Sequence, residues 1–461
     1  MAHHPRVLLV QPPIYDFTAF DLFVYPLGLL ELGATLEAAG CSVALVDALD
    51  RFDPSLRSIA APMAATSSPI KAPTFRGDGC GHFPRERIEP PPPLAEVPRR
   101  FHRFGLAAHT LRERIAAAPR PDLVGITCTM TYWYLGVREV VALVRELYGD
   151  VPVALGGVYA TLCADHARAN TGVDLVVSGR DTTPILKELG LDTAERPQGV
   201  RPAHQLLDPR PSAALRTSHG CPYQCTYCAA HLIAGTFCRR PVDDVLDELT
   251  RLIADRRPGH VAFHDDALIT GRGRAFIELA DRINEEGLNR STAFYSINGL
   301  NATVLSEDVA AALRKSGFRA LRIGFETADL DLQAQTGAKV TGDDLARGLS
   351  NLFDAGFTRR EVGVYVLAGL PGQSAGSIEE TIRFVHALGS QVRLAEYAPV
   401  PQTALFEESR RLSRFDLDEP LFHNKCLAAL RFESLDLARL RELKDLAHRL
   451  NGALLEGESK R

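Results

Sequence analysis

The chain has 461 residues, of which 46% are hydrophobic and 24% charged, and its formal net charge is −5. This length predicts roughly two to four domains of ordinary globular composition. The negative charge argues against non-specific nucleic-acid binding, which requires a basic surface. The N-terminus lacks the apolar core of a signal peptide, and no apolar run reaches membrane-spanning length. Nine cysteines, three of them clustered, fit a reducing compartment, so we expect a cytoplasmic protein without membrane or nucleic-acid partners.

Strand-like and helix-like segments alternate through the first part of the chain. The expected strands are 7–10, 42–46, 123–127, 152–155 and 174–178, and the expected helices are 26–39, 106–117, 136–148 and 161–170. This alternation predicts a doubly wound, Rossmann-like parallel sheet, an α/β domain over residues 1–197 that is followed by a linker at 198–212.

Sheets of this kind bind ligands at the carboxyl ends of their strands. Paired glycines at Gly156 and Gly157 would let the backbone approach a bulky ligand, although a tight strand-to-helix turn explains them equally well. The candidate ligand-binding residues at these strand ends are Gln11, Thr129, Gly156, Gly157, Tyr159 and Gly179.

An insertion at about residues 51–104 interrupts the pattern. It contains Pro90–Pro93 and scattered Gly and Ser without clear periodicity, which is typical of a functional lid or a disordered excursion. Cys80 and His82 lie within it, and such a pair is more often incidental than a metal site. We expect the insertion to influence substrate specificity.

Three cysteines at C-x3-C-x2-C spacing, Cys221, Cys225 and Cys228, follow a strand-like run at 213–218. Thiolates are the usual ligands of iron–sulfur clusters, and a cubane cluster takes four. Three ligands would therefore leave one iron open as a reactive position. A zinc site would favour a second C-x2-C pair downstream, and none is present. The spacing favours a cluster over zinc or unrelated core cysteines.

The second part of the chain predicts a partial (β/α)6 barrel at residues 213–403, followed by a helical segment at 404–461. Its strand-like runs are 213–218, 260–265, 292–298, 320–326, 362–369 and 391–397. Gly317 and Gly356 are placed to end helices, and Ser377 with Glu380 has the spacing of a capping box. We expect Cys238 to be a core residue.

Polar residues and turn glycines stand at the carboxyl ends of these strands, where parallel barrels carry their working residues. The candidates are Asp265, Asp266, Asn298, Glu326, Gly369 and Tyr397. A charge buried there is costly unless a ligand pairs with it. Each acid alone is explained as well by a helix cap or a surface ion pair.

The cysteine motif, with Tyr227 directly before the third cysteine, resembles the signature of the radical S-adenosylmethionine (radical SAM) enzymes. The resemblance implies a [4Fe-4S] cluster on the three cysteines, S-adenosylmethionine on the open iron, and an external reductant such as flavodoxin or ferredoxin. It implies that Tyr227 lies near the adenine, that Asp265 or Asp266 meets the methionyl amine, and that Glu326 faces the cofactor.

Residues 156–161 and 174–179 resemble the cobalamin-binding domain that precedes many radical SAM modules, which implies cobalamin as a further cofactor. Two features depart from that domain. No histidine has an aspartate two positions before it, so the D-x-H-x-x-G motif is absent, and Arg180 stands where Glu is common. A degenerate domain without cofactor stays open.

The resemblances together imply methylation of an unactivated carbon in a small-molecule substrate. One S-adenosylmethionine would methylate cobalamin, and a second would yield the radical that activates the substrate. The alternatives are a cobalamin-dependent rearrangement or cyclisation, and a cobalamin-independent 3-amino-3-carboxypropyl transfer or hydrogen abstraction. A non-enzymatic cluster-binding regulator is the weakest alternative, since a sensor does not need polar groups at every strand end.

Overall fold

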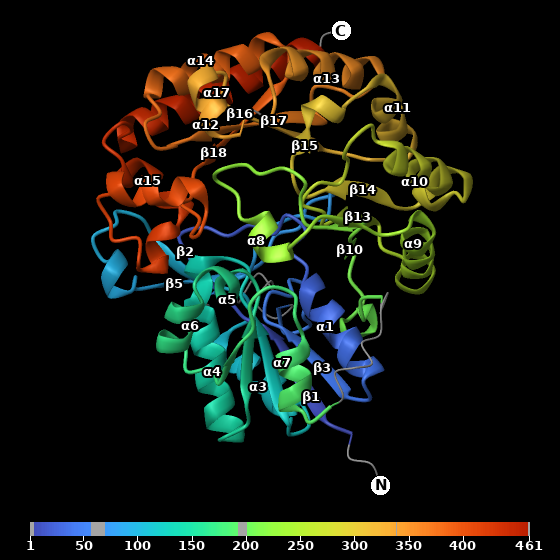
Figure 1. Cartoon of the computed structure of the whole chain (residues 1–461), viewed down its shortest axis with the longest axis vertical. Helices are drawn as coiled ribbons and strands as arrows, with labels where there is room; N and C mark the ends of the chain where they lie inside the picture. Colours follow the sequence, from blue (N-terminus) through green and yellow to red (C-terminus); the bar gives the residue numbers. More distant parts are fainter. Residues whose placement is uncertain (1–3, 57–69, 192–200, 338, 460–461) are drawn as a thin grey trace. The chain divides into compact units, whose positions relative to one another are not determined.

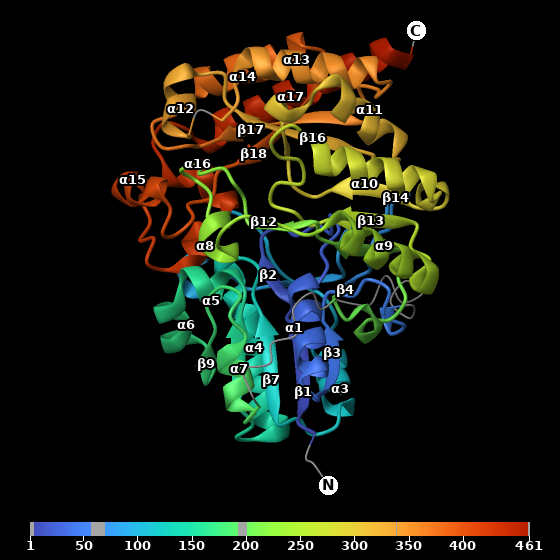
Figure 2. The same ribbon diagram turned by 45° about the vertical axis from the view of Figure 1, so that its right-hand side comes forward.

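The structure is a computed structural model that describes residues 4–56, 70–191, 201–337 and 339–459. The chain divides into two compact units, Met1–Pro211 and Ser212–Arg461, whose ribbons are shown in Figures 1 and 2. Among the described residues, no helix is long and apolar enough to cross a membrane.

The first unit contains a five-stranded parallel sheet, which confirms the predicted doubly wound fold. Its strand order is β3 (Ser42–Asp47), β1 (Arg6–Gln11), β7 (Leu123–Thr127), β8 (Val153–Gly156) and β9 (Leu175–Val176). The chain moves outward from β1 in one direction to β3 and in the other through β7, so the topological switch point lies between β1 and β7. In such sheets, ligands bind in the crevice at this point.

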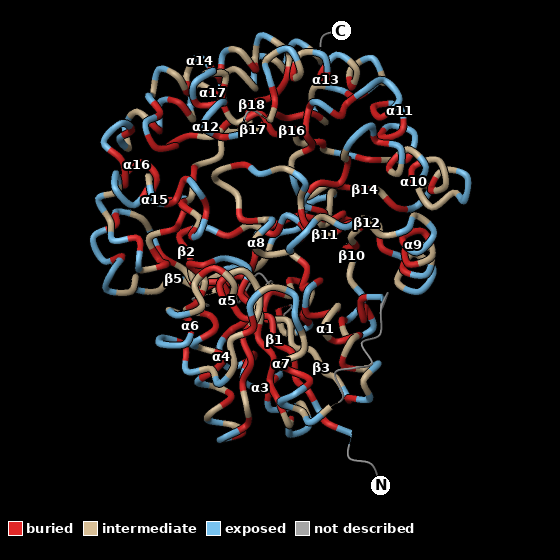
Figure 3. The backbone as a smooth tube through the Cα atoms, viewed as in Figure 1, coloured by how far each residue is buried: buried red, intermediate tan, exposed pale blue. Residues whose placement is uncertain are grey.

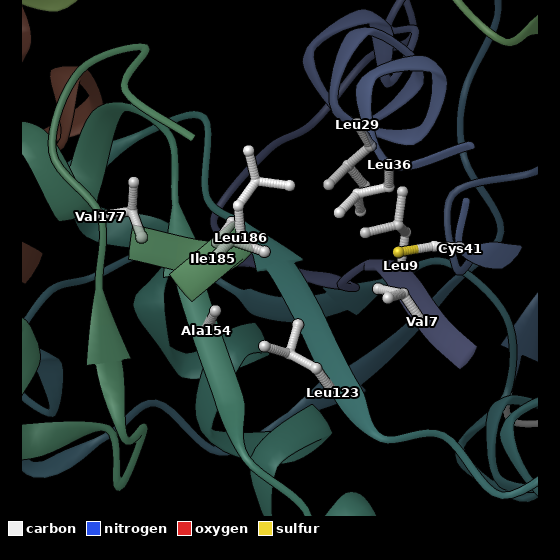
Figure 4. Packing of buried hydrophobic residues seen from close by; sticks show 10 residues of the cluster. All are labelled: Val7, Leu9, Leu29, Leu36, Cys41, Leu123, Ala154, Val177, Ile185 and Leu186. Atoms are coloured by element: carbon white, nitrogen blue, oxygen red, sulfur yellow. The ribbon is translucent and has the colours of Figure 1, made fainter. Parts of the chain in front are cut away.

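Helices cover both faces of this sheet. Helices α1 (Leu27–Ala38) and α7 (Thr183–Glu188) pack on one face, where the cluster in Figure 4 joins side chains of both helices to those of the strands. Because side chains alternate along a strand, Leu8 and Val10 face the other side, where α3 (Ala108–Ala117) and α4 (Tyr134–Tyr148) lie. The predicted helix at 161–170 is broken at Cys163 into α5 (Val158–Leu162) and α6 (Ala164–Asn170).

The described part of the insertion forms ordered strands, so of the two alternatives, a functional lid or a disordered excursion, the disordered one does not hold for these residues. It contributes β4 (Ile70–Lys71), β5 (Arg85–Ile88) and β6 (Phe101–Phe104) to an antiparallel sheet of order β2-β6-β5-β4, whose edge strand β2 (Ile14–Asp16) follows β1. These strands were not predicted because they are short and lack a regular alternation of buried and exposed residues. Residues 57–69 of the insertion lie outside the described residues.

The second unit contains the predicted partial barrel of parallel strands. One sheet has the order β10 (Ser212–Leu215), β13 (His260–Phe263), β14 (Ala293–Ser296), and the other β15 (Leu300–Asn301), β16 (Leu321–Glu326), β17 (Val362–Ala368), β18 (Gln391–Glu396). Two hydrogen bonds join the sheets, from Phe294 N to Gly317 O and from Arg319 N to Phe294 O. The short strand β15 was not predicted.

The barrel helices lie outside the strands, and Figure 3 shows the buried strands beneath them. They are α9 (Val242–Arg256), α10 (Arg274–Glu285), α11 (Glu307–Lys315), α13 (Gly342–Asp354) and α14 (Ala375–Ala387). Gly317 and Gly356 follow α11 and α13 with φ of +87° and +90°, which confirms the predicted glycine ends. The predicted capping box at Ser377 is wrong, because Ser374 caps α14 by accepting a hydrogen bond from Ser377 N.

The C-terminal segment belongs to the second unit and completes it. It contains α15 (Ala404–Leu412), α16 (Ala428–Arg431) and α17 (Leu437–Ser459). The Asn451 side chain on α17 accepts from Val392 N at 2.8 Å and donates to Val392 O at 2.9 Å. It thereby replaces a neighbouring strand at the edge of β18, where unpaired backbone groups would otherwise be exposed.

Candidate cofactor sites

The three cysteines lie in a loop, here called the cysteine loop (residues 220–237), whose ends are closed by two short antiparallel strands. These are β11 (Ser218–His219) and β12 (Cys238–Arg239). Gly220 has φ of +74°, and a Cβ there would lie 2.8 Å from Gly235 O, so the loop closure requires glycine. Cys238 is exposed on β12, and the prediction that it is a core residue is wrong.

The thiols of the cysteine loop are partly desolvated and act on one another. Burial raises the pKa of the Cys221 and Cys228 thiols, and repulsion from neighbouring thiolates adds to the effect. Iron would supply the positive charge that keeps such thiols deprotonated. Among the described residues, no three His, Cys, Asp or Glu side chains converge on one ion-sized position.

Contacts from later parts of the second unit hold the cysteine loop in place. The Thr226 hydroxyl donates to Gln335 O at 2.8 Å, at the end of α12 (Leu330–Gln335), and Leu405 N donates to Thr226 O at 2.9 Å. A Cβ on Gly337 would lie 3.5 Å from Cys225 Cα. The middle of the loop is thus fixed by two segments distant in sequence.

The fully buried Asp265 anchors the base of the cysteine loop. Its carboxylate accepts hydrogen bonds from Thr217 N at 3.0 Å, Thr217 Oγ1 at 2.7 Å and Ser218 Oγ at 2.5 Å. These donors occupy the carboxylate, so Asp265 ties the end of β13 to β10 and β11. In this structure the Asp265 carboxylate stabilises the start of the cysteine loop through these hydrogen bonds.

Asp266, the neighbouring acid, is the more accessible one. Its side chain reaches solvent, and its charge acts on the Cys221 and Cys228 thiols. Desolvation by the surrounding protein raises the pKa of this carboxyl, and Arg216 opposes the rise. Asn298 is also exposed, and its amide donates to Asp265 O at 2.8 Å. Asp266 and Asn298 therefore offer polar groups to a ligand beside the cysteines.

Glu326 ends β16 in a strained conformation with φ of +73°. The pairing register with β17 shifts between Gly324 and Glu326, as in a β-bulge, and bulges re-aim side chains next to functional sites. The Tyr227 hydroxyl donates to Glu326 Oε1 at 3.1 Å. Burial raises the pKa of the Glu326 carboxyl, while Lys339 and the Tyr227 hydrogen bond oppose the rise.

Glu326 and Tyr227 line a shared hollow beside the cysteine loop. Its lining residues are Tyr227, Gly324, Phe325, Glu326, Gln333, Thr336, Lys339 and Val340. Sequence reasoning missed Lys339, whose ammonium lies 5.9 Å from the centre of the Tyr223 ring. No sequence pattern marks a single lysine in a loop as functional. Lys339 reaches the hollow only because the fold brings its loop close to the end of β16.

Gly369 and Tyr397 directly follow the strands β17 and β18. Gly369 has φ of +90°, and its turn is held by the side-chain oxygen of Gln373, which accepts from Gly369 N at 2.9 Å and from Leu370 N at 3.2 Å. Tyr397 is 3% exposed, and its hydroxyl lies 3.0 Å from Ser409 Oγ. Its ring belongs to a core cluster against which Tyr227 packs, so the structure places it behind Tyr227.

A second hollow lies in the first unit at the switch point between β1 and β7. We call it the switch-point hollow, and its lining residues are Gln11, Pro12, Pro13, Ile14, Leu49, Thr127, Cys128, Thr129 and Trp133. The candidates Gln11 and Thr129 are brought together here. Gln11 is 3% exposed, and its Oε1 has no hydrogen-bond partner among the described residues.

The other candidates of the first unit shape nearby loops and do not line this hollow. Gly156 ends β8, and a Cβ on Gly157 would lie 2.7 Å from Cys128 O, so the loops after β7 and β8 approach closely. Gly179 N donates to Thr161 Oγ1 at 2.9 Å. Tyr159 is fully buried, with its hydroxyl 2.6 Å from His166 Nδ1.

Trp133, which sequence reasoning missed, is fixed in the wall of the switch-point hollow. Its indole Nε1 donates to Asp16 Oδ2 on β2 at 2.8 Å. The same small sheet is attached to α4, since Arg103 Nη2 lies 2.7 Å from Glu139 Oε1 and the Tyr15 hydroxyl donates to Glu139 Oε2 at 2.8 Å. The insertion sheet therefore supports this wall.

The model of the radical SAM superfamily matches residues 215–385, and that of the B12 binding domain matches residues 102–187. The second unit thus contains a radical SAM domain, and the first contains a cobalamin-binding domain. The chain therefore combines a radical SAM domain with a B12-binding domain.

Curated relatives agree with this classification. An uncharacterised methyltransferase of Pyrococcus horikoshii is 28% identical over 62% of this chain and 69% of its own length. The hopanoid C-2 methylase of Rhodopseudomonas palustris is 28% identical over 39% of this chain and 37% of its own. The anaerobic magnesium-protoporphyrin IX monomethyl ester cyclase of Rubrivivax gelatinosus is 22% identical over 68% and 63%. The chain thus spans less than two thirds of the latter two relatives.

Solved structures show the same architecture. The radical S-adenosylmethionine methyltransferase TsrM of Kitasatospora setae has a TM-score of 0.62 at 18% identity, over 88% of this chain and 76% of its own. The cobalamin-dependent radical enzyme OxsB has a TM-score of 0.54 at 12% identity, over 94% and 57%. At these identities the likeness establishes the fold.

The two domains identify the cofactors as a [4Fe-4S] cluster with S-adenosylmethionine and cobalamin. The residues present fit both groups. Cys221, Cys225 and Cys228 would hold the cluster, since their thiols interact with one another within one braced loop. The switch-point hollow combines apolar walls with the unused acceptor of Gln11, which is the chemistry that the edge of a corrin, with its methyl groups and amides, would contact.

Proposed function

We propose that this chain is a cobalamin-dependent radical SAM methyltransferase that methylates an unactivated carbon of a small molecule. One observation carries the proposal, namely that a single chain combines a three-thiol loop beside polar strand ends with a switch-point hollow bearing an unused amide acceptor. The methyltransferase and methylase among the relatives support methyl transfer as the outcome.

When bound, the cluster and cobalamin supply reductive cleavage of S-adenosylmethionine and transfer of its methyl group. The residues of the chain bind and orient these groups. The exposed Asp266 carboxylate is suited to the cationic methionyl amine, and the Asn298 side chain to a polar group beside it. Tyr227 presents its ring toward the hollow while its hydroxyl is held by Glu326, so its orientation is fixed before any ligand binds.

Two partners follow from this proposal. Reductive cleavage consumes one electron, so the protein needs a one-electron donor such as flavodoxin or ferredoxin. The proposed substrate is a small molecule, and the net charge of −5 argues against non-specific nucleic-acid binding.

A second candidate function is a cobalamin-dependent cyclisation or rearrangement. The anaerobic magnesium-protoporphyrin IX monomethyl ester cyclase supports it, since that relative aligns over 68% of this chain. In that case the substrate radical would close a ring without receiving a methyl group.

The products of S-adenosylmethionine distinguish these functions. The reconstituted protein would be incubated anaerobically with S-adenosylmethionine and a reductant, with and without hydroxocobalamin. We expect S-adenosylhomocysteine and 5′-deoxyadenosine together, and the former only with hydroxocobalamin. Formation of 5′-deoxyadenosine alone in its presence would favour cyclisation. Methylthioadenosine as the main product would indicate 3-amino-3-carboxypropyl transfer and contradict the proposal.

A further inference from the structure

The antiparallel sheet of the insertion sorts its charged side chains between its two faces. Arg85 of β5 lies opposite Lys71 of β4. Arg87, two positions further along β5, lies opposite His102 of β6. Side chains two residues apart on a strand share a face, and directly opposite residues have Cβ atoms about 4.5–5.5 Å apart on that face. These four side chains, which we call the basic face, therefore stand together on one side of the sheet.

The two faces differ in how their cations are neutralised. On the opposite face, Arg103 lies 2.7 Å from Glu139 Oε1 and 3.8 Å from Glu86 Oε1. On the basic face, neither the lysine nor the two arginines has a carboxylate within ion-pair distance among the described residues. Lys71 and Arg85 are like charges directly opposite each other, which destabilises a sheet. The basic face thus holds positive charge that these residues do not compensate.

Asp16 is the acid of these strands that shares the basic face, since it lies opposite His102. Its carboxylate accepts from Trp133 Nε1 at 2.8 Å and from Phe17 N at 2.6 Å, so neutral donors hold it in place. Three cations and one carboxylate leave the face with two positive charges. A dianion would balance them.

His102 carries a ring nitrogen that the described part of the protein does not use. Its Nδ1 is buried without a hydrogen-bond partner among the described residues. Desolvation lowers the pKa of the imidazole, the charges of Arg85, Lys71 and Arg87 add to this effect, and a hydrogen bond to the Phe17 backbone opposes it. Since Nδ1 is unbonded, that hydrogen bond is donated by Nε2. The neutral ring therefore presents Nδ1 as an acceptor among positive charges.

A phosphate monoester group matches both this charge and this acceptor. With a second pKa of about 6, it is mostly a dianion at neutral pH. Its oxygens accept paired hydrogen bonds from a guanidinium group. A proton can be shared between one of these oxygens and Nδ1 of His102. A carboxylate brings a single negative charge and would leave part of the positive charge unbalanced.

We propose that the basic face is a subsite for the phosphate group of a small molecule, with Arg85 and Arg87 as its cationic contacts and His102 sharing a proton with it. Lys71 adds its charge at the edge of the same face. Because we expect the insertion to influence substrate specificity, we assign the phosphate to the substrate. This assignment rests on the methyl transfer proposed above, whereas phosphate binding itself does not.

Titration calorimetry of the full-length protein tests the subsite with phenyl phosphate and with benzoate, which carries the same ring on a carboxylate. The test variant is Arg87→Met, since Arg87 is exposed and its loss leaves no described carboxylate unpaired. Arg120→Met is the matched control, because Arg120 is an exposed arginine that precedes β7, whereas the insertion sheet follows the carboxyl end of β1. Nuclear magnetic resonance of the imidazoles, with His102→Gln to assign the signal, measures the pKa of His102.

We expect the wild-type protein to bind phenyl phosphate at least about tenfold more tightly than benzoate, and Arg87→Met to lose at least about tenfold in affinity for phenyl phosphate. Arg120→Met should bind like the wild type, and unchanged melting temperatures would show that the variants fold. Saturating phenyl phosphate should raise the pKa of His102, because a neighbouring anion favours the imidazolium form.

Failure of the subsite and failure of the proposed function are distinguishable, because these titrations need no cofactor. Equal affinities for the two probes, an equal loss in Arg120→Met, or an unchanged His102 pKa would overturn the subsite and leave the methyl transfer intact. Phosphate binding as expected, in a protein that forms no S-adenosylhomocysteine with hydroxocobalamin, would keep the subsite and overturn the methyl transfer.

Discussion

The Tyr227 hydroxyl donates to Glu326 Oε1 at 3.1 Å, which links the aromatic residue before the third cysteine to the strained end of β16. The two residues are far apart in sequence, and their contact joins the cysteine loop to the barrel. Both line the hollow beside the cysteine loop, together with Lys339. Because Glu326 is a buried acid, we expect the stability of the protein to depend on its protonation.

Replacing Glu326 by Gln should change how stability depends on pH. Burial raises the pKa of the folded-state carboxyl above its usual value. A raised pKa means that the contribution of Glu326 to stability is complete below the usual carboxyl pKa and is lost as pH rises through the raised value. Gln cannot ionise. The melting temperature of Glu326→Gln, relative to that of the wild type, should therefore rise as pH increases from the usual carboxyl pKa to the raised value.

Glu361→Gln is a matched control of opposite sign. Although burial acts to raise its pKa, hydrogen bonds from Thr358 and the Arg314 charge lower it below the usual value. Its contribution is therefore present at neutral pH and lost as pH falls, so this variant should melt lower than the wild type at neutral pH. Parallel melting profiles for wild type and Glu326→Gln would contradict the assignment.

Cys225→Ala should abolish cluster loading and cleavage of S-adenosylmethionine, because two thiolates leave the cubane without a third protein ligand. Cys238→Ala is the control, since Cys238 lies on β12 at the end of the same loop and is exposed. Iron and sulfide content and 5′-deoxyadenosine formation measure the outcome. Full iron content in Cys225→Ala, or its loss in Cys238→Ala, would refute this assignment of the ligands.

Asp265→Ala should lower the free energy of unfolding by about 3 kcal/mol and reduce iron retention, because it leaves the buried donors of Thr217 and Ser218 unpaired. Asp266→Asn, at the exposed neighbour, should change stability by no more than about 0.5 kcal/mol and weaken S-adenosylmethionine binding. Denaturant unfolding and equilibrium dialysis separate the two roles. Equal stability of the two variants would show that Asp265 does not anchor the loop.

Arg51→Met tests whether the insertion is held by its buried ion pair. Arg51 lies 2.6 Å from Asp21 with a side chain that is 1% exposed, and it donates to Thr74 O and Gly79 O. The variant should lose about 3–5 kcal/mol, since Asp21 would be left buried and unpaired. Arg76→Met, which breaks a pair with Asp78 at a site 63% exposed, should lose no more than about 1 kcal/mol. Similar losses in thermal or denaturant melts would argue against the anchor.

The sequence predicted the elements that local patterns encode. The alternation of strands and helices predicted parallel sheets in both units, and the spacing of Cys221, Cys225 and Cys228 predicted one compact loop. Both follow from short-range rules of periodicity and ligand spacing. The candidate cofactor residues differ in their surroundings. Asp266 is exposed and Glu326, although bonded to Tyr227, lines a hollow, whereas Asp265, Tyr159 and Tyr397 have polar atoms bonded within the protein.

What the sequence did not predict depends on contacts between distant segments. Trp133 is oriented by a hydrogen bond to Asp16, which is 117 positions away. Lys339 lines the same hollow as Glu326, at the end of β16. The insertion sheet was missed because its strands are short and lack the alternation of a strand with one buried face. Cys238 is exposed on β12, where it pairs with His219 of β11. No local sequence pattern predicts this pairing.

The central claim is that this one chain holds both a cluster and a corrinoid, and the cofactor content of the reconstituted protein tests it most directly. The full-length protein would be reconstituted anaerobically with iron, sulfide and hydroxocobalamin, desalted, and analysed for iron and for corrinoid absorbance. The account predicts about four iron ions and about one corrinoid per chain, with Cys225→Ala losing the iron and keeping the corrinoid. A wild-type protein that retains iron but no corrinoid absorbance would contradict it.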